Sequence, residues 1–316
     1  MEEKITNIHQ EHDKLFKVFF KLKETLIEYL ENFFPPELLA FIAIEELELD
    51  DTSYISPDMK AFYSDVVHRS KLKLPNFEDK GEIPLALAFL LEHKILSEDF
   101  IHLQLMHYEQ AIWRKDIADN RPLTFVLPIV IYQGKSKWEV KPFVAHFPHL
   151  PPPFFKYLPS FEYHFTNARD VDTPKLEKLK GILGSLFLAY KHLDDIKYLD
   201  QHISYLFKSF EGKPNLKEIR QIYVAYVVRN AVISGEKLKQ NLETLTDKSI
   251  KSEIMTTYQY ILQEGEVKGK LEGKLEEKRL GIIKALKRRK LTIAEISEDF
   301  EVPVEFVLKI RTETGL

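Results

Sequence analysis

Two segments, SDVVHRSKL (Ser64–Leu72) and IPLALAFLLEHK (Ile83–Lys94), decide the fold of this chain. Both are rich in β-branched and large apolar residues. The NFEDKGE stretch between them contains the Asn, Asp and Gly typical of loops, so the pattern predicts two strands joined as an antiparallel hairpin. A register centred inside that loop would place Asp65 directly opposite Glu92, with their Cβ atoms roughly 4.5–5.5 Å apart.

Two carboxylates at that distance repel each other and are tolerated best when a cation lies between them. Side chains alternate along a strand, so Glu92 and Lys94 are expected on one face and His93 on the other. Carboxylate oxygens suit Mg²⁺, Mn²⁺ or Ca²⁺, the backbone carbonyl of His93 would be a further ligand, and a nearby ammonium would orient an attacking water. Asp65, Glu92 and Lys94 together therefore indicate hydrolysis of a phosphodiester.

The order of Asp65 followed by Glu92-x-Lys94 resembles the catalytic signature of the PD-(D/E)XK nuclease superfamily. Five ordered blocks over roughly residues 9–140 resemble, more closely, the Rpn family of recombination-promoting nucleases, also labelled as transposases. These blocks are HDKLFK (His12–Lys17), FFPPELLAFI (Phe33–Ile42), YSDVVHRSKL (Tyr63–Leu72), LLEHK (Leu90–Lys94) and PIVIYQGKSKW (Pro128–Trp138). Many members of the resembled family have Gln where Lys94 stands, so Lys94 matches the wider superfamily better.

The resemblance implies a metal-dependent DNA endonuclease that promotes recombination or acts on mobile DNA. In this interpretation Asp65, Glu92 and Lys94 are catalytic, and the metal is Mg²⁺, Mn²⁺ or Ca²⁺. The residues alone leave alternatives open, because Glu-x-Lys recurs seven more times in the chain and strand-end charges are common. A catalytically inactive DNA- or protein-binding module that acts through the C-terminal helices is the main alternative, and an RNA-directed hydrolase is another.

Composition restricts the class of protein. The chain has 316 residues, of which 44% are hydrophobic and 30% charged, as expected for a globular protein. The absence of cysteine excludes disulfides, thiolate catalysis and Cys-ligated zinc. No apolar run approaches the ~20 residues needed to span a bilayer, and the first residues are charged, so we expect a cytoplasmic protein with no membrane partner.

An amphipathic helix is predicted from Glu11 to Phe33, because its apolar residues recur close to every 3.6 positions and Pro35-Pro36 follows. In nucleases that resemble this superfamily, a helix before the core strands sometimes carries an acidic residue that assists the metal. Asp13 is the candidate here. It is equally well explained as a residue that caps the start of the helix.

A second helix, Ser97–Asp119, and a buried strand, Thr124–Tyr132, follow the hairpin. A helix between two strands of one sheet makes a crossover, so the new strand should lie parallel to the strand that ends at Glu92. The predicted fold is α/β, a restriction-endonuclease-like core of helix, mixed central sheet and helix, followed by an all-helical C-terminal region. Gln104 and Tyr132 are candidate accessory residues of the site, although both are also explained as structural.

The segment between residues 141 and 160 contains six of the 16 prolines, which excludes a regular helix. It is predicted to be an ordered, aromatic-rich connector or a recognition loop. The histidines in and near this segment have no compact ligand spacing, so a metal site is not predicted there.

The rest of the chain is predicted to be helical. Amphipathic helices are predicted at residues 176–193, 198–210 and 216–232, followed by a charged, partly helical and flexible linker and three short helices that resemble a helix-turn-helix. Seven Lys or Arg and no acid lie between residues 278 and 290. Arg288, Arg289 and Lys290 are therefore candidate DNA contacts, and dimerisation through the C-terminal helices is the alternative role of this tail.

Four parts follow from these patterns. A nuclease-like core is predicted at residues 1–145, a Pro-rich connector with a helical bundle at 146–250, a charged helical linker at 251–281 and a helix-turn-helix-like tail at 282–316. The expected partners are DNA and a second copy of the chain. The net charge of −4 argues against a protein that coats nucleic acid nonspecifically, but it permits a nuclease with a local basic groove.

Overall fold

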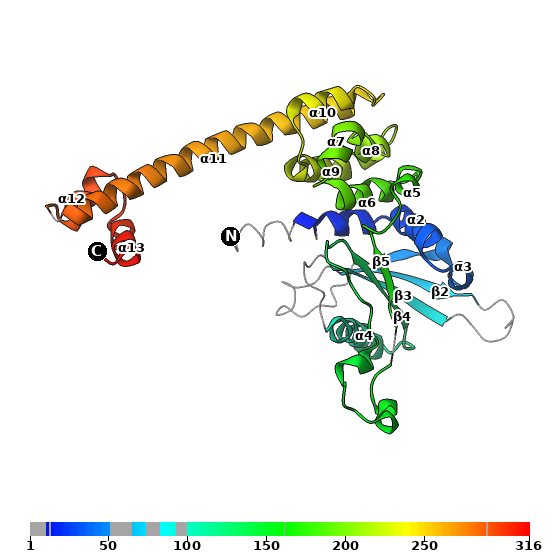
Figure 1. The fold of residues 1–316 in the computed structure, drawn as a ribbon. Coiled ribbons are helices and arrows are strands. Elements are labelled where there is room, and N and C mark those ends of the chain that lie inside the picture. The colour runs from blue at the N-terminus through cyan, green and yellow to red at the C-terminus, as the bar shows by residue number, and fades with distance from the viewer. Residues whose placement is uncertain are drawn as a thin grey trace. The chain divides into compact units, whose positions relative to one another are not determined.

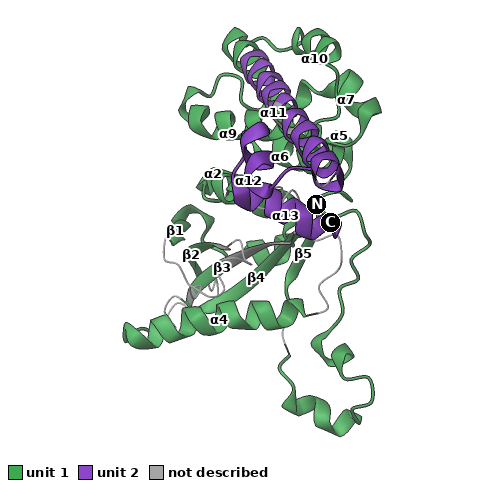
Figure 2. Ribbon diagram, turned by 90° about the vertical axis from the view of Figure 1, so that its left-hand side faces the viewer, with its two compact units in different colours: residues 1–254 green, residues 255–316 purple. Residues whose placement is uncertain are grey.

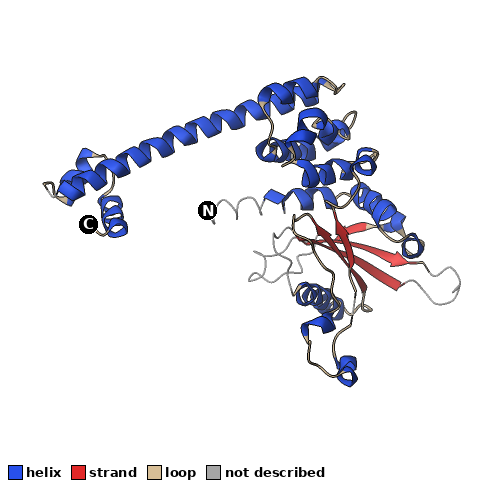
Figure 3. Ribbon diagram, viewed as in Figure 1, coloured by secondary structure: helices blue, strands red, loops and turns tan. Residues whose placement is uncertain are grey.

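The computed structural model describes the backbone of residues 11–12, 14–50, 65–73, 83–92, 100–160, 162–288 and 290–316. The described chain forms two compact units, residues 1–254 and 255–316 (Figure 2). The first unit contains the β-sheet with the helices that cover it. The second unit consists of helices only (Figure 3).

A mixed sheet of five strands, in the order β1-β2-β3-β4-β5, forms the centre of the first unit. β2 pairs antiparallel with β1 and β3, whereas β4 runs parallel to both β3 and β5. The parallel pairing of β3 with β4 confirms the predicted crossover. The strands are β1 (Glu48–Asp50), β2 (Asp65–Leu72), β3 (Ile83–Glu92), β4 (Phe125–Tyr132) and β5 (His164–Asn167).

Helices cover both faces of this sheet (Figure 1). The 18-residue helix α4 (Ile101–Ala118) lies on one face, where its Ile112 packs with Val67, Ala86 and Val126 from three neighbouring strands. The N-terminal helices lie on the other face, where Tyr29 of α2 (Lys23–Phe33) hydrogen-bonds to Thr166 of β5 at 2.8 Å. The sheet is thus the middle layer of three.

The register of β2 against β3 differs from the prediction by two residues. Asp65 pairs with Leu90 rather than with Glu92, so the hairpin is centred between Phe77 and Glu78. A slip of two residues leaves every side chain on its original face, so the alternation of apolar residues does not distinguish the two registers. The predicted direct pairing of the two carboxylates was therefore wrong, and the consequence for the site is given below.

The predicted helix from Glu11 to Phe33 is interrupted at Lys21 and Leu22. Residues 14–20 are helical, and α2 begins anew at Lys23. At the break, Nε2–H of the buried His68 on β2 donates to the carbonyl of Phe20 at 2.6 Å. The sheet thereby contacts the backbone at the end of the first helical segment. α2 ends before Pro35-Pro36 as predicted, and the short helix α3 (Pro36–Leu39) and a 3₁₀ turn (Ile44–Glu46) lead to β1.

The two outer strands were not predicted. β1 has three residues and β5 has four, and each occupies an edge of the sheet, where only one side is paired. Strands this short give almost no alternation to detect. The Pro-rich segment before β5 contains two 3₁₀ helices, Phe143–His146 and Pro152–Tyr157, in agreement with the prediction that it forms no regular helix.

Short helices complete the first unit, and two of the predicted long helices are each split in two. The break between α5 and α6 contains Gly181, whose backbone N–H donates to the carboxylate of Glu28 on α2 at 2.5 Å. A Cβ on Gly181 would meet a Glu28 carboxylate oxygen at 2.2 Å, so a larger residue would displace the Glu28 side chain. The helices are α5 (Thr173–Glu177), α6 (Leu183–His192), α7 (Ile196–His202), α8 (Tyr205–Lys208), α9 (Lys217–Asn230) and α10 (Gly235–Leu242).

The charged segment expected to be a partly helical linker is one continuous helix, α11 (Lys248–Arg288). In the second unit its last turns pack with α12 (Ile293–Asp299) and α13 (Val304–Thr314) around Ile282, Ile296, Val307 and Ile310. Thr292 caps α12 in a capping box with Glu295. None of the described helices has an apolar stretch long enough to cross a membrane.

A buried carboxylate fixes the C-terminal end of α4 to the sheet. Asp116 is fully buried, accepts a 2.9 Å hydrogen bond from the backbone N–H of Thr124, and lies 3.1 Å from the Arg121 guanidinium and 3.7 Å from that of Arg69 on β2. Arg69 also contacts Asp50 of β1 at 2.5 Å. One carboxylate thus joins α4 to β2 and to the start of β4.

Asp116→Ala should lower the free energy of unfolding by about 2–3 kcal/mol, because the charge-assisted hydrogen bonds of a buried carboxylate are lost. Urea unfolding followed by circular dichroism measures this change. Asp119→Asn is the matched control, since Asp119 is exposed and pairs only at the surface with Arg121. Equal stability of the two variants would contradict the anchoring role of Asp116.

Acidification should destabilise the fold in part through His68. Burial lowers the pKa of His68 below 6.5, and the hydrogen bond to the Phe20 carbonyl offsets this only partly. Below pH 6.5 the unfolded chain therefore takes up a proton that folded His68 resists, so stability falls as the pH falls, by up to about 1.4 kcal/mol per pH unit for one proton. Urea midpoints between pH 8 and pH 5 should show a weaker fall in His68→Gln than in the exposed-site control His149→Gln. Identical pH profiles for the two variants would contradict this assignment.

Candidate functional site

The candidate site lies at one end of the sheet, where β2 begins and where β3, β4 and β5 end. We call this end the site edge. Asp65 is the first residue of β2 and Glu92 is the last residue of β3, so the backbone brings both predicted metal ligands to the site edge. Tyr132, the last residue of β4, is the register partner of Glu92.

The observed register makes Asp65 and Glu92 diagonal neighbours. Leu90 is the direct partner of Asp65, and Glu92 is two residues further along β3. Because the pleat alternates with a period of two, positions 65 and 92 belong to the same face, and diagonal neighbours of this kind lie ~7–8 Å apart. The backbone there is described, but the side chains of Asp65 and Glu92, and all of Asp13, His93 and Lys94, lie outside the described residues.

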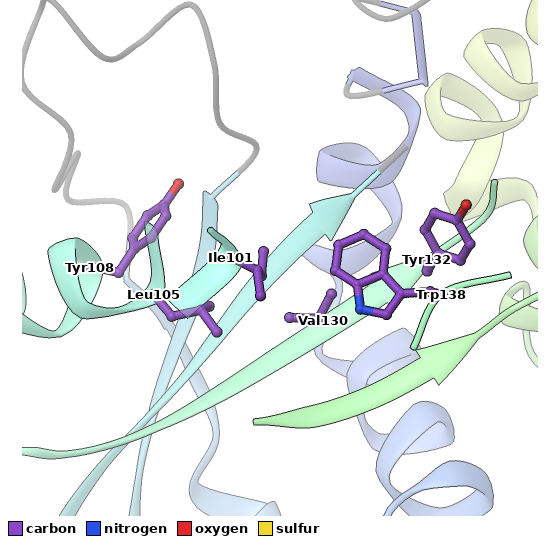
Figure 4. Packing of buried hydrophobic residues seen from close by; sticks show 6 residues of the cluster. All are labelled: Ile101, Leu105, Tyr108, Val130, Tyr132 and Trp138. Carbon is purple, nitrogen blue, oxygen red and sulfur yellow. The ribbon is translucent and has the colours of Figure 1, made fainter. Parts of the chain in front are cut away.

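An apolar cluster from α4 and β4 supports the site edge on that face (Figure 4). Ile101, Leu105 and Tyr108 of α4 pack with Val130 and Tyr132 of β4 and with Trp138. The first turns of α4 therefore lie over the ends of the parallel strands, on the face to which positions 65 and 92 belong. α4 positions this end of the sheet through direct packing.

Tyr132 is part of that cluster. Its ring is fully buried, with its centroid 5.0 Å from that of Trp138, and its hydroxyl donates to the backbone carbonyl of Ser136 at 2.9 Å. This hydrogen bond closes the turn that follows β4. Tyr132, a candidate accessory residue, is thus the backbone register partner of Glu92, and its described side-chain contacts hold the turn.

Gln104 and Gln133 lie near the same edge. Gln104 is half-buried on α4, next to the stripe of residues that faces the sheet. Gln133, directly after β4, is buried, and within the described part of the chain its Nε2 has no hydrogen-bond partner. Its backbone carbonyl accepts a 2.8 Å hydrogen bond from Arg169 Nε. The Gln133 amide is therefore a buried polar group within the site edge, at the end of β4.

Sequence reasoning missed a buried polar stripe on α4. His102, Glu109 and Asp116 are all buried although the helix has an exposed face. Burial raises the pKa of Glu109 and lowers that of His102, whose pKa the nearby His146 lowers further. The three residues are spaced by seven, which places them on one side of a helix. The spacing of seven residues is the feature of the sequence that could have revealed this stripe.

The donor chemistry of the site edge fits a hard divalent cation. Two carboxylate-bearing positions share a face and an edge, and oxygen ligands are those that Mg²⁺ and Mn²⁺ prefer. Among the side chains that the structure describes, no group of three His, Cys, Asp or Glu is suited to hold a metal. That finding does not include the side chains of Asp65 and Glu92.

Three basic residues of the second unit were predicted as DNA contacts. Arg288 is exposed at the last turn of α11, Lys290 is exposed between α11 and α12, and Arg289 lies outside the described residues. Within the same basic segment, Lys278 and Arg279 form ion pairs with Glu301 and Glu313. Part of this charge is therefore used inside the second unit.

Comparison with known families shows which family the chain belongs to. The family described as "Putative transposase, YhgA-like" matches residues 10–218, which is more than half of the chain. The chain belongs to this family. The match includes all five strands and α4, and it ends before α11, α12 and α13 begin.

Curated relatives of the chain are named as nucleases. The recombination-promoting nuclease RpnD of Escherichia coli O157:H7 is 27% identical over 125 residues, which are 39% of this chain and 45% of RpnD. The recombination-promoting nuclease RpnA of Escherichia coli strain K12 is 29% identical over 124 residues, which are 39% of this chain and 40% of RpnA.

A further relative carries the name of an inactive protein. The inactive recombination-promoting nuclease-like protein RpnE of Escherichia coli strain K12 is 29% identical over 128 residues, which are 40% of this chain and 40% of RpnE. The matched part spans less than half the length of each of these three relatives. No solved structure matches the chain. The comparisons thus show a nuclease and transposase-like family that includes proteins named as inactive.

Gly134→Ala should destabilise the site edge. A Cβ at Gly134 would meet the Tyr132 hydroxyl at 2.1 Å, and Tyr132 is fully buried, so its ring would have to move inside a packed cluster. Overpacking of this kind costs typically about 1–3 kcal/mol. Thermal unfolding measures the loss. Gly265→Ala is the control, because a Cβ there meets nothing within 4 Å, and a stable Gly134→Ala variant would contradict the tight packing of Tyr132.

Proposed function

We propose that the protein is a metal-dependent DNA endonuclease that hydrolyses phosphodiester bonds at the site edge. The observation that carries this proposal is the pairing of β2 with β3, which makes positions 65 and 92 diagonal neighbours on one face. These positions lie inside the segment that matches the family, and two relatives that match 39% of the chain are named recombination-promoting nucleases.

In this proposal each residue of the triad has a distinct role. Asp65 and Glu92 would hold one divalent ion, and the backbone carbonyl of His93 would be a further ligand. Lys94 orients the attacking water and stabilises the negative charge that develops on the phosphate. Asp13, Gln104 and Tyr132 would support these groups from the neighbouring helices and from β4.

Mg²⁺ or Mn²⁺, when bound, would polarise the phosphoryl oxygen as a Lewis acid. The chain's own residues supply the geometry. α4 covers the face of the sheet to which Asp65 and Glu92 belong, and its packing against Val130 and Tyr132 fixes the ends of the strands. A rigid edge is required because a catalytic group displaced by about 1 Å loses much of its effect.

The wider setting follows from the names of the relatives. We propose that the substrate is cellular or mobile DNA in the cytoplasm and that cleavage promotes recombination. Arg288, Arg289 and Lys290 would add phosphate contacts from the second unit, and the same C-terminal helices would provide the surface of a homodimer. These roles lie beyond the segment that matches the family.

A second candidate function is that of a binding module without catalytic activity. The observation that favours it is the relative RpnE, whose name describes an inactive protein and whose match covers a similar length. In that case the sheet would be a scaffold and the C-terminal helices would bind DNA or protein. Cleavage assays distinguish the two functions directly.

Supercoiled plasmid should be nicked by the full chain in Mg²⁺ or Mn²⁺. Asp65→Asn, Glu92→Gln and Lys94→Ala should each lower the nicking rate about 100-fold or more, because each removes a ligand or a charge needed in the transition state. Agarose-gel time courses on identically purified proteins measure the rates, and circular dichroism checks that each variant is folded.

Two charge-matched controls accompany this series. Asp119→Asn removes an exposed carboxylate at the far end of α4, and Lys73→Ala removes an exposed ammonium that pairs with Glu45. Both should cut at the wild-type rate. If the wild-type protein never cuts, or if Asp65→Asn cuts as fast as the wild type, the endonuclease proposal fails and the binding module is the better account.

A further inference from the structure

A pocket of about 490 Å³ lies beside the first turns of α4. Residues of α4 and of the proline-rich segment between β4 and β5 form its walls. The sequence predicts that this segment is a connector or a recognition loop. Residues that line it include His102, Lys141, Phe143, Phe155, Glu162 and Tyr163. The volume falls within the range of roughly 300–1,000 Å³ that is typical of small-ligand sites.

The pocket is lined by aromatic rings around a buried histidine. The His102 ring centroid lies 5.5 Å from that of Phe143 and 5.6 Å from that of Tyr163, with interplanar angles of 52° and 71°. Burial lowers the pKa of His102, so its imidazole is neutral at pH 7 and adds no charge to the wall. Flat aromatic walls without a dominant charge suit a flat, uncharged ring.

Shared packing connects this pocket to the site edge. Tyr163 lines the pocket and also packs against the cluster of Ile101, Val130 and Tyr132. Tyr132 in turn is the register partner of Glu92. His102 directly follows Ile101 on α4. The pocket and the proposed catalytic positions therefore lie at the same end of the sheet in the same compact unit.

The polar groups of the pocket match the two halves of a nucleotide. Lys141 supplies an ammonium of the kind that contacts a backbone phosphate, while Ser160 and Glu162 supply hydrogen-bonding groups for the edge of a base. Aromatic side chains are the usual stacking partners of unpaired bases, because every base has a π face.

We propose that this pocket holds one unstacked nucleobase of the DNA strand that is cut. This inference rests on the proposed endonuclease function and adds its substrate class: single-stranded DNA, or duplex with unpaired or easily opened bases. A fully paired duplex must first unstack a base to reach the pocket, which disfavours its binding. The chain should therefore bind single strands more tightly than duplex.

Phe155 and Phe154 provide a matched test. Both belong to the same 3₁₀ helix and both are exposed, at 42% and 53%, but only Phe155 lines the pocket. Alanine at either position should leave the fold intact, since neither side chain is part of the core. A difference between the two variants then reports on the pocket itself.

Fluorescence anisotropy of the full chain with a labelled single-stranded oligonucleotide, in EDTA to prevent cleavage, measures the affinity. Phe155→Ala should weaken single-strand binding about 5- to 100-fold, the range found when a base-stacking aromatic residue is replaced by alanine. Phe154→Ala should bind as the wild type does. A paired duplex of the same sequence should bind more weakly than the single strand.

Three results would overturn the proposal: equal affinities of Phe155→Ala and Phe154→Ala, tighter binding of paired duplex than of single strand, or tighter binding of RNA than of DNA of the same sequence. Plasmid nicking by the same preparations shows whether only the base-pocket proposal fails or whether the endonuclease proposal fails as well. A wild type that nicks plasmid while Phe155→Ala binds normally would retain the endonuclease and refute the base pocket.

Discussion

The antiparallel pairing of β2 with β3 is the constraint on which the candidate site depends. This pairing sets which residue of β3 lies nearest to Asp65, and it makes Glu92 a diagonal neighbour rather than a direct partner. Direct partners would bring the two carboxylates to roughly 4.5–5.5 Å between Cβ atoms, whereas diagonal positions are ~7–8 Å apart. The wider spacing reduces the repulsion between the charges and leaves room for a cation between them.

The layers around the sheet maintain this pairing. α4 is attached at both ends: Ile101 and Leu105 pack at the site edge, and the buried carboxylate of Asp116 contacts Thr124 and Arg69 near the opposite end. On the other face, His68 and Thr166 hydrogen-bond to the N-terminal helices. β2, β4 and β5 are thus each held from a second layer, which limits sliding of the strands that would separate the two acidic positions.

The sequence alone predicts those helices and strands whose hydrophobic patterns extend over many residues. The central hairpin, the crossover helix and the parallel strand β4 each extend over eight or more residues, and all three are present. The shared face of positions 65 and 92 followed from the predicted pairing alone, because apolar residues lie on both faces of β3 and both faces are buried. The absolute register was not predictable, since a shift of two residues conserves every face.

Other features depend on contacts between distant residues and therefore have no local signal. The break at Lys21 and Leu22 occurs where His68, 48 residues away from Phe20, binds the carbonyl at the end of the preceding turn. The turn before α6 depends on the contact between Gly181 and Glu28. The pocket formed by α4 and the Pro-rich segment likewise depends on tertiary packing, although composition did indicate that the segment is aromatic and irregular.

Mn²⁺ binding tests the convergence of Asp65 and Glu92 most directly, because it requires both residues but neither cleavage nor a DNA substrate. Electron paramagnetic resonance titration of the full chain should show one site that is lost in Asp65→Asn and equally in Glu92→Gln, and that remains in Asp119→Asn. A site that survives either of the first two substitutions would contradict the account, because the strands would then not bring these two carboxylates to a common metal.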